Sequence, residues 1–142
     1  AKGYVGDQAI APLREHGVRS ALYEAGGDVV VSDPPPGRAG WDVAILHPEG
    51  AGRDRVLSVR NCAVATSGDL NQFVEIDGER YSHVVDPRTG VGLTDRWLAT
   101  VVAPKGVLAD ALSTAAGIMG ARARPMVEGF EGVRLFLRQA GQ

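Results

Sequence analysis

Apolar residues recur along the chain in two spacings, one typical of helices and one typical of strands. The helical spacing predicts a first helix over residues 4–16, stopped by Gly17. Its apolar positions form one stripe: Val5, Ala9, Ile10 and Leu13. The same spacing predicts a second helix over residues 107–119, ended by Gly120. Its apolar stripe is longer: Val107, Leu108, Ala111, Leu112, Ala115, Ile118 and Met119. A short, weaker helix is expected at residues 125–127.

Shorter apolar runs predict strands between and after these helices. They cover residues 21–24 with 29–31 (one strand interrupted by Gly26-Gly27), 41–46, 55–66, 73–76, 80–85, 97–103 and 133–137. Asp77-Gly78 is typical of a hairpin turn, and the proline-rich residues 32–37 predict a surface loop. Hairpin connections favour an α+β fold, an antiparallel sheet with flanking helices, over a doubly wound one. We expect one domain over residues 1–142.

Composition and charge exclude several classes of protein. Fifteen basic and 17 acidic residues leave a net charge of −2 without a basic cluster, which argues against nucleic-acid binding through bulk positive charge. No apolar run approaches the roughly 20 residues of a membrane helix, so no transmembrane segment is predicted. The single cysteine, Cys62, excludes internal disulfides and thiolate-rich zinc sites. Glycine is frequent, at 19 of 142 residues, which predicts tight turns and close backbone approaches.

The beginning of the chain is unusual for a complete domain. It opens with Ala1-Lys2-Gly3-Tyr4, without Met, without a signal-peptide pattern and without an N-cap residue before the first helix. We therefore expect the chain to begin within a structural unit; the alternative is an unseen leader or tag ahead of Ala1.

Common nucleotide and hydrolase motifs are absent. The sequence contains no G-x-x-x-x-G-K, G-x-G-x-x-G, H-E-x-x-H or G-x-S-x-G. Asp110 and Thr114 lie four residues apart and so share one helix face, which we expect opposite the apolar stripe. Two oxygen ligands suit a hard cation such as Mg²⁺ or Ca²⁺. The alternative is an Asp that favours the helix dipole and a Thr bonded back to the helix.

A histidine and two glycine-containing segments could also take part in chemistry. His83 lies at a predicted strand end, before a loop over residues 86–90, and could be a base or a phosphate contact. The loop could equally be only a turn. Gly26-Gly27-Asp28 and Ala65-Thr66-Ser67-Gly68 could bring backbone N–H groups to a phosphate or ring, although each could be a simple bulge or turn. Cys62 fits a small core residue better than a nucleophile.

Taken together, these segments resemble one family, because they occur in its order and spacing. They are Ala1-Lys2-Gly3-Tyr4-Val5-Gly6-Asp7, Gly26-Gly27-Asp28, Ala65-Thr66-Ser67-Gly68, Ser82-His83 through Asp86-Pro87-Arg88-Thr89-Gly90, and Ala109-Asp110-Ala111-Leu112-Ser113-Thr114. The family is ApbE, the FAD:protein FMN transferases, once labelled thiamine-biosynthesis lipoproteins. The resemblance runs from the first residue to about Gly120. It implies an ApbE-like, T-fold-related fold, of which this chain would be the C-terminal portion.

The resemblance also implies a reaction and a set of site residues. Family members bind FAD and Mg²⁺, cleave the pyrophosphate, attach FMN to a threonine of a target protein and release AMP. Asp110 and Thr114 match metal-ligand positions, and Lys2 and the Val84 backbone match positions at the flavin. His83 matches the histidine thought to help deprotonate the acceptor hydroxyl. A further family metal ligand, a backbone carbonyl, lies upstream of Ala1, so an upstream fragment is a possible partner.

Alternatives to protein flavinylation stay open on the sequence. One is an FAD pyrophosphatase of the same family, which yields FMN and AMP. Another is a non-catalytic flavin-binding module, since residues 1–142 alone lack part of the family's site and are expected to bind FAD poorly. The resemblance suggests an extracytoplasmic location, the periplasm or cell surface of a bacterium.

Overall fold

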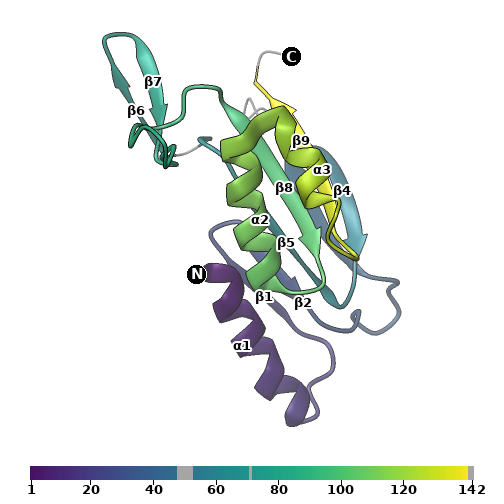
Figure 1. Cartoon of the computed structure of the whole chain (residues 1–142). Coiled ribbons are helices and arrows are strands. Elements are labelled where there is room, and N and C mark those ends of the chain that lie inside the picture. Colours follow the sequence, from purple (N-terminus) through teal and green to yellow (C-terminus); the bar gives the residue numbers. More distant parts are fainter. Residues whose placement is uncertain (48–52, 71, 141–142) are drawn as a thin grey trace.

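A five-stranded antiparallel sheet forms the centre of the structure, a computed structural model that describes residues 1–47, 53–70 and 72–140 (Figure 1). In spatial order its strands are β1 (Leu22–Ala25), β2 (Asp28–Val31), β5 (Cys62–Ser67), β8 (Trp97–Ala103) and β9 (Arg134–Gln139). Two further antiparallel pairs are β3 (Trp41–Leu46) with β4 (Arg53–Val59), and β6 (Phe73–Ile76) with β7 (Glu79–Ser82). The helices are α1 (Lys2–Glu15), α2 (Gly106–Met119) and α3 (Ala123–Val127), with a 3₁₀ turn at Gly120–Arg122. The predicted α+β class with an antiparallel sheet is confirmed.

The central sheet is buried on both faces. The helices pack on one face, against alternate strand residues such as Val30, Ala65 and Val101. The β3–β4 pair covers the other face, and its cluster consists of Val31, Val43, Val59, Val64 and Val102. Because neighbouring residues of one strand contact opposite apolar layers, β5 and β8 are apolar at most positions, Thr66, Ser67 and Thr100 excepted, instead of alternating.

The helix ranges are close to prediction, but the buried faces coincide with the predicted stripes only in part: Ile10 of α1 and Leu112 of α2 are buried as predicted. Helix α2 is buried through Gly106, Ala109, Leu112, Ser113, Ala116 and Gly117. Val107, assigned to the apolar stripe, is 46% exposed. Small residues allow the helix axis to come close to the sheet, and that close packing selects this face over the face with the larger side chains.

Helix α1 shows the same correction more strongly. Its buried residues are Gly3, Gly6 and Ile10, whereas Val5 and Leu13 of the predicted stripe are exposed. A Cβ atom at Gly3 would lie 2.1 Å from the carbonyl oxygen of Gly106. The backbones of α1 and α2 therefore touch where both helices begin, which only glycine permits.

Two predicted strands prove to be pairs of strands. Residues 21–31 form the β1–β2 hairpin, because Gly26 (φ 54°) and Gly27 (φ 90°) make a tight turn with two positive φ angles. Residues 55–66 break at Asn61 (φ 49°), where β4 ends and β5 begins.

The other local predictions hold, with shifted ends. The Asp77-Gly78 turn joins β6 to β7 as predicted, but β7 ends at Ser82. The short third helix and the last strand are both present, each displaced by one to a few residues. The β6–β7 hairpin projects from the body of the molecule (Figure 1). Within the described residues, none of the helices is long and apolar enough to cross a membrane.

Candidate functional site

All five residues that the sequence singled out for the site line one open cavity of about 790 Å³. Lys2 comes from the first turn of α1, His83 and Val84 follow β7, and Asp110 and Thr114 lie on α2. The cavity is completed by the turn between β1 and β2 and by the end of β5. Its volume is in the range of small-molecule and cofactor sites, roughly 300–1,000 Å³. Residues up to about 110 positions apart are thus brought to one site by the packing of α1 and α2.

Asp110 and Thr114 face the cavity with oxygen atoms available. The backbone nitrogens of Ala1 and Gly3 both donate to Oδ2 of Asp110, at 2.8 and 2.9 Å. Within the described chain, Oδ1 receives no hydrogen bond and can bind a ligand. The Thr114 hydroxyl donates to the Asp110 carbonyl at 3.1 Å, so the predicted alternative of a Thr bonded back to the helix is present. That hydroxyl still has lone pairs, and it lies 3.1 Å from the hydroxyl of Ser67.

The chemistry of this pair fits a hard cation, although two side-chain oxygens do not complete its coordination shell. Among the described residues, there is no group of three or more His, Cys, Asp or Glu side chains that could hold a metal. A cation here would take its other oxygen ligands from water, backbone carbonyls or a bound phosphate. The prediction for the helix face that carries Asp110 and Thr114 was wrong. This face flanks the buried face of α2 and does not lie opposite it.

The surroundings of Asp110 favour its charged form. Burial raises the pKa of the Asp110 carboxyl, whereas the hydrogen bond from the backbone N–H of Gly3 lowers it. The ammonium of Lys2 acts in the same direction. An ionised carboxylate with one free oxygen is what a cation site requires.

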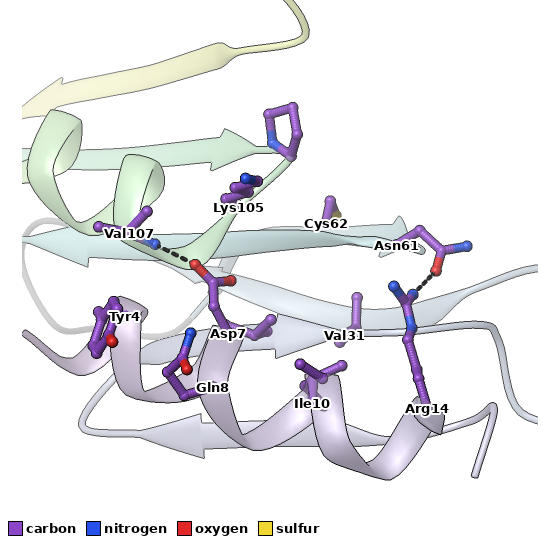
Figure 2. A pocket seen from close by; sticks show the side chains of 13 residues that line it. Tyr4, Asp7, Gln8, Ile10, Arg14, Val31, Asn61, Cys62, Lys105 and Val107 are labelled. Carbon is purple, nitrogen blue, oxygen red and sulfur yellow. Dashed lines mark hydrogen bonds between the residues drawn. The ribbon is translucent and has the colours of Figure 1, made fainter. Parts of the chain in front are cut away.

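Asp7 fixes the start of α2 against α1, a role the sequence did not reveal. Its two carboxylate oxygens accept the N–H groups of Gly106 and Val107, at 2.7 and 2.9 Å. Figure 2 shows the second of these bonds, from α1 across to the first turn of α2. The side chain thereby caps a helix about 100 residues away. A local capping pattern cannot predict such a contact, because donor and acceptor are not neighbours in the sequence.

The side chain of Asp28 also has contacts that the sequence did not reveal, because the Gly26-Gly27-Asp28 segment was considered only for its backbone N–H groups and its family resemblance. Its side chain is only 4% exposed, and Oδ1 lies 3.6 Å from the ammonium of Lys2. Oδ2 has no hydrogen-bond partner among the described residues. Burial raises the pKa of Asp28, with Lys2 opposing this rise and Asp110 adding to it. The available signal was a carboxylate at the head of the otherwise apolar strand Asp28–Val31.

His83 is exposed and held by one carbonyl group. Its Nδ1 lies 3.0 Å from the carbonyl oxygen of Gln72, which also accepts the His83 backbone N–H. Because a carbonyl oxygen only accepts, Nδ1 carries the proton, and in the neutral ring Nε2 keeps its lone pair. This is the tautomer that a general base at Nε2 requires.

The backbone N–H and carbonyl groups of Val84, the next residue, already make hydrogen bonds within the protein. The N–H of Val84 donates to Ser82 Oγ at 3.0 Å, and its carbonyl accepts from Leu93 at 2.9 Å. Any ligand contact through this backbone would therefore use the second lone pair of the carbonyl oxygen. The following loop is a turn, as its composition allowed: Gly90 donates to the Asp86 carbonyl at 2.8 Å, and the Asp86 carboxylate pairs with Arg88.

A second cavity, of about 380 Å³, lies between α1 and the β2 and β5 strands (Figure 2). None of the five predicted site residues lines it. Cys62 does, half-buried, and burial raises the pKa of its thiol. A raised pKa leaves less thiolate at neutral pH, in agreement with a packing role.

Comparison with known proteins places this architecture. The model of the ApbE family matches residues 1–137. A FAD:protein FMN transferase of Treponema pallidum is 38% identical over 131 residues, 84% of this chain and 36% of the relative. One of Rhodobacter capsulatus is 36% identical over 97% of this chain and 26% of the relative. The chain thus spans about a quarter to a third of the length of these relatives.

Solved structures agree with the sequence matches. The crystal structure of an ApbE protein from Thermotoga maritima superposes with a TM-score of 0.88 at 35% identity, covering 99% of this chain and 47% of that one. The apo flavinyl transferase ApbE of Pseudomonas stutzeri gives a TM-score of 0.81 at 29% identity, over 100% and 44% of the two chains. By the match over nearly its whole length and by its fold, this chain belongs to the ApbE family.

Proposed function

We propose that this chain carries part of the active site of a FAD:protein FMN transferase, which moves FMN from FAD to a threonine hydroxyl of a target protein and releases AMP. The observation that carries the proposal is the meeting of Lys2, His83, Val84, Asp110 and Thr114 in one cavity. The curated relatives named above bear this activity in their names. They are longer than this chain, so the activity belongs to the full-length protein.

Asp110 and Thr114 are the proposed protein ligands of Mg²⁺. The free Oδ1 of an ionised carboxylate, beside a hydroxyl held by Ser67, supports this assignment. Mg²⁺ held by these two residues would supply positive charge to balance the negative pyrophosphate oxygens. Lys2 is proposed to contact the ligand from the opening turn of α1, where its ammonium lines the same cavity.

His83 is the proposed general base. The threonine oxygen bonds to the phosphorus of the FMN moiety, the bond from that phosphorus to the AMP oxygen breaks, and AMP keeps the bonding electron pair. The hydroxyl proton moves to Nε2 of His83, which keeps its lone pair in the neutral ring because the ring proton sits on Nδ1, facing the Gln72 carbonyl. The exposure of His83 supports this role, because an acceptor protein must reach it from outside.

Substitution of His83 tests the proposed reaction. In the full-length protein, His83→Ala should lower flavin transfer to an acceptor protein by about 10²-fold or more, while FAD binding changes much less. In-gel flavin fluorescence measures transfer, and fluorescence titration measures binding. His16→Ala is the matched control, because His16 is also exposed and also bonded through Nδ1, to Pro12, at the far end of α1.

The products separate protein flavinylation from its alternatives. Near-wild-type transfer by His83→Ala would remove this residue from the chemistry. Free FMN and AMP without labelled protein would assign the pyrophosphatase activity instead. Bound but unaltered FAD would assign a binding module.

Substitution of Asp110 tests the metal assignment. Asp110→Asn should raise the Mg²⁺ concentration needed for half-maximal activity, because an amide oxygen binds a hard cation more weakly than a carboxylate does. Excess Mg²⁺ should restore part of the activity. Thr114→Val, which keeps the shape and removes the oxygen, should be a milder form of the same defect. An unchanged Mg²⁺ midpoint in Asp110→Asn would exclude this residue as a ligand.

A further inference from the structure

The ammonium of Lys2 is held by two oxygens, one from the turn between β1 and β2 and one from the first residue of β2. It donates to the carbonyl oxygen of Gly26 at 2.9 Å and lies 3.6 Å from Oδ1 of Asp28. The Lys2 side chain is half-exposed, whereas that of Asp28 is almost fully buried. The flexible four-carbon side chain of Lys2 is therefore held at its ammonium group, and the Asp28 side chain that holds it is itself fixed by burial.

The same ammonium also acts on Asp110. Its charge helps to lower the pKa of Asp110, and the charges of Asp28 and Asp110 are close enough for Asp110 to raise the pKa of Asp28. One cation therefore serves two carboxylates, and it makes its ion pair with Asp28. If it paired with Asp110 instead, it would occupy the free Oδ1 and cancel the charge that attracts a metal ion.

Stability alone does not account for a carboxylate at position 28. Asp28 is the first residue of β2, and the other three residues of this strand are valines. Its Oδ2 has no hydrogen-bond partner among the described residues. A buried, unpaired oxygen on a charged group destabilises a fold. An acid held there at such a cost points to a role at the adjoining cavity, which Asp28 lines.

We infer that Asp28 is a positioning residue that holds Lys2 away from Asp110 and so keeps the Asp110 carboxylate open to a divalent cation. The inference rests on the proposed role of Asp110 as a metal ligand. It assigns to the Gly-Gly-Asp turn a purpose beyond its backbone geometry: the glycines make the turn, and the acid sets where the ammonium of Lys2 lies.

A double-mutant cycle on cation binding tests this inference. Mg²⁺ binding to the full-length protein without FAD is measured by titration calorimetry for wild type, Asp28→Asn, Lys2→Met and the double variant. Asp28→Asn keeps the shape but frees Lys2 to pair with Asp110, and should weaken Mg²⁺ binding by about tenfold. In the Lys2→Met background the same substitution should weaken binding only about two- to threefold, through the lost charge alone. Non-additivity of this size is usual for residues in contact.

Two controls keep the test interpretable. Asp42→Asn removes an equal charge from an exposed ion pair with Arg38, outside the cavity, and should leave Mg²⁺ affinity unchanged. The Lys2→Met substitution adds no bulk beside the buried side chain of Asp28. This variant should bind Mg²⁺ at least as tightly as the wild-type protein. Weaker binding by Lys2→Met, or additive effects in the cycle, would overturn the inference.

A crystal structure of Asp28→Asn separates this inference from the metal assignment itself. The Lys2 ammonium should have left Gly26 and lie within ion-pair distance of Asp110. An ammonium that remains on Gly26 would refute the positioning role, whatever the cation affinity. Absence of Mg²⁺ binding by the wild-type protein would instead count against Asp110 and Thr114 as metal ligands.

Discussion

Removing the Asp7 carboxylate should loosen the junction of α1 and α2. Its two oxygens accept the first N–H groups of α2, from Gly106 at 2.7 Å and Val107 at 2.9 Å. Loss of a single capping hydrogen bond costs about 0.5–2 kcal/mol, and hydrogen bonds to charged groups contribute about 1.5–3 kcal/mol each. The hydrogen bond from Val107 is exposed, so water partly replaces it when the carboxylate is removed. We therefore expect Asp7→Ala to destabilise the junction by about 3 kcal/mol.

Amide hydrogen exchange in the full-length protein measures this effect where it occurs. A loss of about 3 kcal/mol corresponds to roughly 100-fold faster exchange of the Gly106 and Val107 amides. Asp7→Asn keeps one acceptor oxygen and should show about half of the free-energy loss. Gln8→Ala, an exposed neighbour on α1, should change stability by less than about 0.5 kcal/mol.

The reasoning would be refuted by Asp7→Ala and Gln8→Ala variants with the same exchange rates at Gly106 and Val107. Such a result would mean that packing of the two helices alone fixes the start of α2. A global loss of stability without faster local exchange would likewise separate a general effect of Asp7 from its capping role.

Two further predictions concern the close helix contact and the loop after His83. Gly3→Ala should destabilise the protein by about 2–3 kcal/mol in urea unfolding, because the new Cβ would lie 2.1 Å from the Gly106 carbonyl oxygen. That oxygen belongs to the backbone and cannot rotate away as a side chain could. Wild-type stability of the variant would contradict this packing. The side-chain hydrogen bond from Arg88 lowers the pKa of Asp86 from 3.8 to about 2, so its stabilising effect should be complete above pH 3.8 and disappear as the pH falls through about 2. The stability difference between wild type and Asp86→Asn, measured across that range, should shrink accordingly, and a difference independent of pH would exclude the ion pair as its source.

Local signals in the sequence were sufficient for most elements but not for their buried faces. Asp77-Gly78 and the run over residues 97–103 predicted a hairpin and a core strand, because turn chemistry and apolar runs are properties of neighbouring residues. The buried face of α2 was predicted only at Leu112. Gly106 and Ala109 were missed, since they are weakly hydrophobic and lie at the sheet because of their small volume. Interior volume depends on what the partner presents, which no single helix reveals.

The candidate site shows the same division. Its five expected residues came from a family resemblance and lie together in one cavity. The roles of the side chains that hold these residues in place could not be predicted from the sequence, because Asp7 and Asp28 act on residues far away along the chain. A carboxylate within a helix or at the head of a strand has no local pattern that identifies a distant partner.

The contact between Gly3 and Gly106 limits how the protein can vary. A tight contact between two side chains can be relieved when one partner becomes smaller, so substitutions at such pairs can compensate each other. Neither glycine has a side chain to reduce, and each would place a Cβ within 2.3 Å of the other's carbonyl oxygen. A larger residue at either position therefore cannot be rescued at the other, and only a shift of a whole helix could accommodate it. Such a shift would separate the Gly3 N–H from Asp110, so the spacing of the two helices and the shape of the cavity must change together.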